Sequence, residues 1–339
     1  MKSFNNHTTL YRFLLNLFFV LSLSAFNLNF SQNQIQAQTP KSILLQEKTT
    51  VSENIFYKTN KEGSVALDIY SPKNSSDEKH PVLIYVHGGG WIGGDKVIHA
   101  DSYIENMILK LVEKEYTVVS INYTLVNKDV HFPLPIQDTK DAIRWVRKNA
   151  DKYHFDTNNI GLFGASAGAH LSLLAAYTED NEFVGAPELS PYSAKVNYVV
   201  NNFGPTDLNK LLHTRVGNVG AFFVSLFSKK IVDLRDKLIL GISGYDIKKD
   251  KRKVIDYFKT LSPVTYIDNA TPTLILQGNK DKIVPLKQSE ILKRKLDKKD
   301  IKNKLTIVEG GIHGFGTTDK SYLNQLVDEM VDYIVSQKK

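Results

Sequence analysis

Two short glycine-bounded motifs contain the residue types that an acyl-transfer site requires. Residues 87–91 read His-Gly-Gly-Gly-Trp, and residues 164–168 read Gly-Ala-Ser-Ala-Gly. Each motif follows a strand-like apolar run, and a helix-like apolar segment follows the second one. Small neighbours permit the strained strand-to-helix turn that exposes a nucleophilic serine. A helix-capping serine is the alternative, but capping does not require small residues on both sides. The second motif therefore predicts Ser166 as a nucleophile.

A nucleophilic serine needs a base, and the base needs a carboxylate that orients it. Asp281 follows the apolar strand predicted at 273–277, and His313 lies in the glycine-rich loop 309–315. Taken alone, Asp281 would be interpreted as a turn former or a helix cap. The order Ser166, Asp281, His313 is one in which catalytic triads occur. We predict that Asp281 holds His313, which deprotonates Ser166 and later protonates the leaving group.

The other histidines fit the role of the base less well. His170 lies four residues after Ser166 on the same predicted helix, and its side chain is expected to face the packing side. His131, His154 and His213 do not follow a predicted strand. We therefore expect His170 to be structural.

Donors for a developing oxyanion are expected from the backbone. Gly88 and Gly89 have no side chain between their N–H groups and a substrate, and Ala167 supplies a third N–H at the start of a helix. A phosphate-binding loop is the rival interpretation of 87–94, but the lysine and hydroxyl spacing of such loops is missing. Trp91 is predicted to wall the substrate pocket or to pack under this loop.

The periodicity of the chain predicts an α/β fold with a mostly parallel central sheet flanked by helices. Strands at 51–57 and 64–70 are expected to form an antiparallel pair. From residue 81 onward, nearly continuous apolar strands alternate with amphipathic helices, which is typical of a parallel sheet that is buried on both faces. The predicted strands are 82–86, 117–123, 160–163, 196–202, 273–277 and 304–308, and the predicted helices are 100–115, 136–149, 166–177, 286–298 and 320–336.

The interval at about 206–260 does not follow this alternation. Apolar runs at 219–227 and 231–242 predict amphipathic helices instead of strands. We interpret the interval as a helical cap inserted into the sheet, where apolar residues contact the substrate. A helical excursion that packs its own small core is an equally good interpretation.

The composition is that of an ordinary soluble globular protein. The chain has 339 residues, of which 42% are hydrophobic and 23% charged, and its net charge is +7. It contains no cysteine, which excludes disulfides, thiolate metal sites and a cysteine nucleophile. The lysine clusters at 248–253 and 293–304 are interpreted as solvated helix faces. A surface for polyanions is the alternative, but no nucleic-acid motif supports it.

The N-terminus has the pattern of an export signal. Lys2 and Arg12 precede an apolar run that fits the ~7 to 15 residues of a signal peptide. We predict a signal peptide at 1–37, a polar linker at 38–50 and a hydrolase domain at 51–339, and therefore a secreted or periplasmic protein. A retained membrane anchor is the alternative.

Together these motifs resemble the α/β-hydrolase esterases, in particular the acetyl xylan and feruloyl esterase type related to the hormone-sensitive-lipase group. The resemblance rests on 87–91, 138–147, 164–171, 203–207 and the segments around Asp281 and His313. It implies the α/β-hydrolase fold and a triad that needs no metal or organic cofactor. The chain departs from many relatives at 122–125, where an arginine is common, and at Ala169, where glycine is common.

The expected function is that of an exported serine ester hydrolase acting through an acyl-enzyme. Its expected substrates are small-molecule or oligosaccharide esters with short acyl groups, such as acetyl or feruloyl esters of polysaccharide. Acetate or butyrate should be preferred because no long apolar tunnel is evident. No nucleic acid and no stable membrane anchor after signal cleavage are expected, and the oligomeric state stays open. The alternatives are an amidase or peptidase related to kynurenine formamidases or prolyl oligopeptidases, and a non-catalytic binding protein with the same fold.

Overall fold

The computed structural model describes residues 39–73, 78–215, 229–316 and 318–339. The predicted signal peptide at 1–37 and the apolar run at 219–227 lie outside the described residues. Within these ranges no helix is both long enough and apolar enough to cross a membrane.

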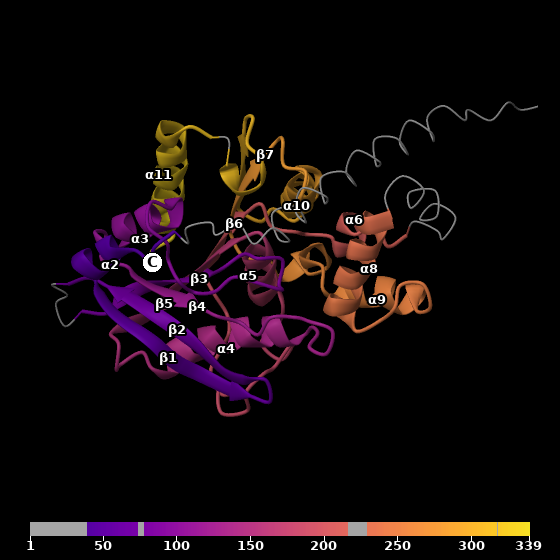
Figure 1. The fold of residues 1–339 in the computed structure, drawn as a ribbon. Helices are drawn as coiled ribbons and strands as arrows, with labels where there is room; N and C mark the ends of the chain where they lie inside the picture. Colours follow the sequence, from indigo (N-terminus) through magenta and orange to yellow (C-terminus); the bar gives the residue numbers. More distant parts are fainter. Residues whose placement is uncertain (1–38, 74–77, 216–228, 317) are drawn as a thin grey trace, which may run out of the picture.

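An eight-stranded sheet in the order β1-β2-β4-β3-β5-β6-β7-β8 forms the centre of the described residues (Figure 1). β1 and β2 are antiparallel, β2 joins β4 antiparallel, and every further pairing is parallel. The predicted α/β class is therefore confirmed. The strands are β1 (Thr50–Asn60), β2 (Gly63–Ser71), β3 (His80–Val86), β4 (Thr117–Ile121), β5 (Phe155–Ala165), β6 (Tyr198–Asn202), β7 (Thr273–Gly278) and β8 (Asn303–Val308).

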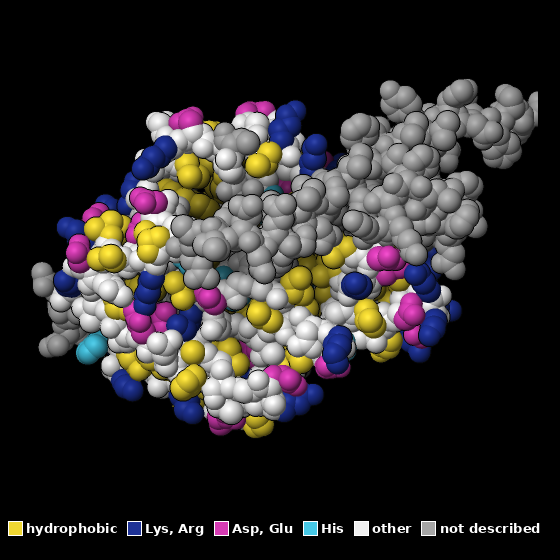
Figure 2. Space-filling model, viewed as in Figure 1, with side chains coloured by type: hydrophobic (Ala, Val, Ile, Leu, Met, Phe, Trp, Pro, Cys, Tyr) yellow, Lys and Arg dark blue, Asp and Glu magenta, His cyan; other side chains and the backbone are white. Residues whose placement is uncertain are grey.

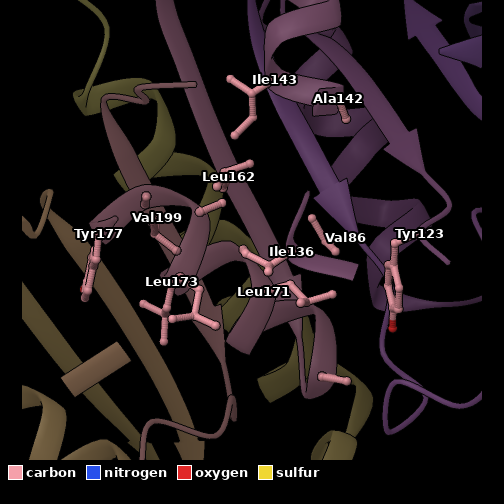
Figure 3. Packing of buried hydrophobic residues seen from close by; sticks show 14 of the residues in the cluster. Val86, Tyr123, Ile136, Ala142, Ile143, Leu162, Leu171, Leu173, Tyr177 and Val199 are labelled. Carbon is pink, nitrogen blue, oxygen red and sulfur yellow. The ribbon is translucent and has the colours of Figure 1, made fainter. Parts of the chain in front are cut away.

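Helices cover both faces of the sheet. α3 and α11 pack on one face, and α4, α5 and α10 pack on the other. Figure 3 shows this second layer, in which Ile143 of α4 and Leu171 of α5 lie near Leu162 of β5. The helices are α2 (Ile43–Lys48), α3 (Tyr103–Val112), α4 (Leu134–Lys148), α5 (Ala167–Tyr177), α6 (Leu208–Leu211), α8 (Lys229–Ser243), α9 (Lys251–Thr260), α10 (Lys287–Asp297) and α11 (Lys320–Ser336).

The register of the parallel strands brings the loops of the predicted site to one edge. Val86 at the end of β3 pairs with Gly164 of β5, so the two glycine motifs begin side by side. Gly278 at the end of β7 pairs with Val308 of β8 in the same way. The loops that carry Asp281 and His313 therefore start from neighbouring strand ends.

The interval between β6 and β7 is helical in its described parts. It contains α6, α8 and α9, which lie together at the side of the sheet away from β1 and β2 (Figure 1). Acidic and basic side chains are interspersed over α8 and α9 on the face seen in Figure 2. Lys248, Lys249 and Lys253 all pair with aspartates at the surface.

The segment at 38–50 is not the linker that the sequence predicts, because from Lys41 onward it packs on the domain. Lys41 forms a β-bridge with His99, and the Ser42 hydroxyl caps α2 by accepting a hydrogen bond from the Leu45 amide at 2.9 Å. Leu45 is 1% exposed and belongs to the core beside α3. Burial of Leu45 and the cap at Ser42 thus hold this stretch on the domain in spite of its polar composition.

A buried ionic cluster joins the edge of the sheet to α4. The Lys58 ammonium lies 2.7 Å from Asp138 and 2.8 Å from Asp141, and Arg144 lies 3.1 Å from Asp141. Burial by itself lowers the pKa of Lys58, but Asp138 and Asp141 outweigh it, so that the pKa is raised. Asp138 also accepts a hydrogen bond from the Thr124 amide at 2.7 Å, which ties the loop after β4 to this cluster.

Replacing Lys58 by methionine should lower the free energy of unfolding by about 3 kcal/mol, because the change leaves buried carboxylate charge without its partner. Lys79→Met is the matched control, since Lys79 pairs with Asp151 at an exposed site and should cost less than about 0.5 kcal/mol. Chemical denaturation measures both variants. An equal decrease of the unfolding free energy in the two variants would show that the buried cluster stabilises the fold no more than an exposed ion pair does.

Candidate active site

Ser166 stands on a strained turn between β5 and α5. Its φ of 54° and ψ of −118° are unfavourable for a residue with a side chain. The turn holds because α5 lies very close to the sheet: a Cβ atom on Gly168 would lie 2.0 Å from the carbonyl oxygen of Val86. The Ser166 amide also donates a hydrogen bond to the Asn202 carbonyl at 2.9 Å. The close approach at Gly168 explains why this position must be glycine.

The structure brings the three predicted triad residues together. The Ser166 hydroxyl lies 2.9 Å from Nε2 of His313, and Nδ1 of His313 lies 2.7 Å from Oδ2 of Asp281. With a proton on Nδ1, the imidazole donates to the carboxylate and accepts from the hydroxyl. This arrangement can remove a proton from Ser166 while Asp281 fixes the ring.

Asp281 is held by three further hydrogen bonds. Its Oδ1 accepts from the amides of Ile283 and Val284 at 2.8 and 2.9 Å, and its Oδ2 accepts from Nε2 of Gln277 at 3.0 Å. The oxygen of the Gln277 amide accepts in turn from the Ser289 hydroxyl at 2.9 Å. Sequence reasoning missed the roles of Gln277 and Ser289. The available signal was a polar side chain at the end of a strand that is otherwise apolar.

An aromatic side chain also supports His313. The ring centroids of Phe203 and His313 lie 4.8 Å apart at an interplanar angle of 66°. Phe203 in turn meets Phe315 edge to face at 4.9 Å. Phe203 lies just after β6, and in the sequence it stands out only as part of the segment 203–207. Its ring limits the positions that the imidazole can take.

The predicted oxyanion donors face the same cavity as Ser166. Gly88, Gly89 and Ala167 all line it. In the described ranges, none of their three amides donates a hydrogen bond to another backbone carbonyl. The φ of Gly89 is 111°, and a Cβ atom there would lie 2.0 Å from the carbonyl oxygen of Gly93, so only glycine fits this tight turn. The amides are therefore placed to donate hydrogen bonds to a substrate oxygen on which negative charge develops.

A buried stacking contact fixes the loop that carries Gly88 and Gly89. His87 stacks on Tyr123 with ring centroids 4.3 Å apart, and the Tyr123 hydroxyl donates to the His87 carbonyl at 3.2 Å. Burial lowers the pKa of His87, which favours the neutral ring. The strand predicted to reach Tyr123 ends at Ile121, and Tyr123 lies beyond it, stacked on His87.

Trp91 combines the two roles considered for it. It lines the cavity and is only 3% exposed, with its ring packed edge to face against Phe132 and His170. His170 is fully buried and its Nε2 donates to the Leu261 carbonyl at 2.7 Å, so it contributes to the structure as predicted. Burial lowers the pKa of His170 to about 4.

The cavity in front of Ser166 has a volume of about 760 Å³. The structure has a mainly apolar cavity here. The sequence did not show it, because the walls come from segments that are far apart along the chain. Loop residues lie on one side and the cap helices on the other. The apolar lining residues from these segments include Ile92, Pro205, Leu211, Leu212, Leu234, Leu238, Leu240, Ile283 and Val284.

Replacing Gln277 by methionine should slow the reaction of Ser166 with a fluorophosphonate about tenfold, because Asp281 loses the donor that fixes it. Ser289→Ala removes only the next bond in the chain and should have a smaller effect. Time courses of labelling, with folding checked by circular dichroism, give the rates. An unchanged rate in folded Gln277→Met would contradict the positioning role.

The free energy of unfolding should fall as the pH is lowered from 6.5 toward 4. In the unfolded chain a histidine binds its proton near pH ~6.5, whereas His170 in the folded protein stays neutral down to about 4. The unfolded state therefore binds more protons in this window, and at pH 4.5 this histidine should account for a loss of about 2 kcal/mol. Denaturation of wild type and of His170→Gln at pH 7 and 4.5 measures the difference. Identical pH slopes would contradict it.

Comparison with known proteins places the chain in a family. The BD-FAE family model matches residues 67–296. Esterase LipC of Mycobacterium tuberculosis is 28% identical over 66% of this chain and 50% of its own length, and esterase LipQ of the same organism is 31% identical over 66% and 47%. The chain thus spans about half the length of these curated relatives.

Solved structures share the fold of this chain. A truncated form of a carbohydrate esterase from gut microbiota aligns with a TM-score of 0.67 and 27% identity, over 88% of this chain and 98% of that one. An acetyl ester-xyloside bifunctional hydrolase from Caldicellulosiruptor lactoaceticus shares the fold at a TM-score of 0.63 and 21% identity. The chain therefore belongs to the BD-FAE family and has the α/β-hydrolase fold.

Proposed function

We propose that this protein is a carboxylic ester hydrolase that works through a covalent acyl-enzyme on Ser166. The observation that carries the proposal is the hydrogen-bonded series Ser166, His313, Asp281, which faces a cavity lined by amides that donate to no backbone carbonyl in the described ranges. The family membership and the esterase names of the relatives support it.

The reaction follows from the geometry. The Ser166 oxygen attacks the ester carbonyl carbon as its proton passes to Nε2 of His313, and the carbonyl oxygen becomes an oxyanion bound by the amides of Gly88, Gly89 and Ala167. When the intermediate collapses, the alcohol leaves with the proton from His313. Water then attacks the acyl-enzyme in the same manner and releases the carboxylic acid.

We propose short acyl esters of carbohydrate alcohols as the substrates, with acetyl or butyryl groups preferred. The carbohydrate esterase named among the solved structures supports this choice. A cavity of about 760 Å³ is much larger than an acetyl group, so most of its volume is available to the alcohol part. Residues 1–37 have the pattern of a signal peptide, and we propose that the protein acts in the periplasm or outside the cell.

Ser166→Ala should lower kcat/KM for 4-nitrophenyl acetate by about 10⁴ or more, because the nucleophile is lost. Ser172→Ala is the matched control on α5, since the Ser172 hydroxyl is buried and donates to the Gly168 carbonyl at 2.8 Å. Assays on acetate, butyrate and octanoate esters, acetylated xylan and acetanilides test the substrate class. Full activity in Ser166→Ala contradicts the mechanism, and preference for octanoate or for anilides contradicts the substrate assignment.

A further inference from the structure

One face of the cap helix α8 lines the cavity. Leu234, Lys237, Leu238 and Gly241 all contribute to the lining, at the spacing that puts residues on one side of a helix. Lys237 is the one charged residue of this face. A lysine in a stripe of apolar residues departs from the usual pattern, in which charges occupy the opposite side of the helix.

The charge of Lys237 has no partner in the described part of the chain. None of the described carboxylates lies within ion-pair distance of its ammonium group, including Asp233 one turn earlier. Residues 216–228 contain no aspartate or glutamate in the sequence. By contrast, Lys128 at the cavity pairs with Asp129 at 2.6 Å, and Lys248 pairs with Asp236 at 3.4 Å. Lys237 is thus an exposed cation at the cavity lining that no described carboxylate compensates.

No acidic residue is found among the described residues that line the cavity. Lys237 is exposed, so solvent screens its charge in part, but the apolar walls beside it limit this screening and strengthen its attraction for anions. The cavity therefore favours a ligand that presents apolar surface to the leucines and a negative group to α8.

We infer that Lys237 selects esters whose alcohol part carries a carboxylate, such as acetyl esters of acidic sugars. The inference rests on the proposed function and extends it to the substrate. The acyl groups proposed above, acetyl and butyryl, carry no charge, so the carboxylate belongs to the alcohol part. A carboxylate and an ammonium form a charge-assisted hydrogen bond that a neutral substituent does not form.

The test uses two acetates of the same shape, 4-acetoxybenzoate and its neutral amide 4-acetoxybenzamide. The quantity measured is the ratio of kcat/KM for the anionic ester to kcat/KM for the neutral one. Lys237→Met should lower this ratio about fivefold, mainly through a higher KM for the anionic ester. Lys237→Arg should retain the ratio, and added salt should reduce it in the wild type.

Lys248→Met is the matched control, because this lysine lies near the same helix but outside the cavity lining. An unchanged ratio in Lys237→Met overturns the inference, since hydrolysis of the neutral ester shows that the variant is folded and active. A second pair, 4-nitrophenyl hydrogen adipate and 4-nitrophenyl hexanoate, places the charge on the acyl side. An effect of Lys237 confined to that pair also overturns the assignment.

The two proposals fail in different ways. If the wild-type protein hydrolyses neither acetate, the proposed function is refuted together with the inference that rests on it. If it hydrolyses both and the ratio does not depend on Lys237, the inference alone is refuted.

Discussion

The close contact between α5 and β3 is the constraint on which the rest of the site depends. Because Gly168 has no side chain, the start of α5 can lie against the Val86 carbonyl, where a Cβ atom would be only 2.0 Å away. This contact sets the turn at Ser166 and places the first amide of α5 beside the loop after β3. Ser166 and the proposed oxyanion donors are thus positioned by backbone packing, which no single surface substitution can easily disturb.

Polar contacts extend this rigid centre toward the last two strands. Asp281 receives hydrogen bonds from the loop that follows it and from Gln277, while His313 is confined by the ring of Phe203. These contacts restrict the orientations of Asp281 and His313, which keeps the proposed proton-transfer geometry in place. The cap adds leucines and Lys237 of α8 to the lining of the cavity in front of Ser166.

Local patterns made the fold class and the three triad candidates predictable from the sequence. Ser166 could be identified because the small residues that its turn requires are the two residues before it and the two after it. The contacts of Gln277 with Asp281 and of Tyr123 with His87 could not be predicted. A polar or aromatic residue near the end of a strand does not reveal which side chain it will contact. The sequence also could not show which face of α8 lines the cavity, and the polar composition of 38–50 concealed the one leucine, Leu45, that anchors it.

The most direct test of the central claim is to locate the group that an organophosphate modifies. The protein would be inactivated with paraoxon and digested, and its peptides would be mapped by mass spectrometry. The account predicts one diethyl phosphoryl adduct, on Ser166, and a large decrease of that adduct in His313→Asn. Inactivation with the adduct on another residue, or equal modification of Ser166 in the absence of His313, would contradict it.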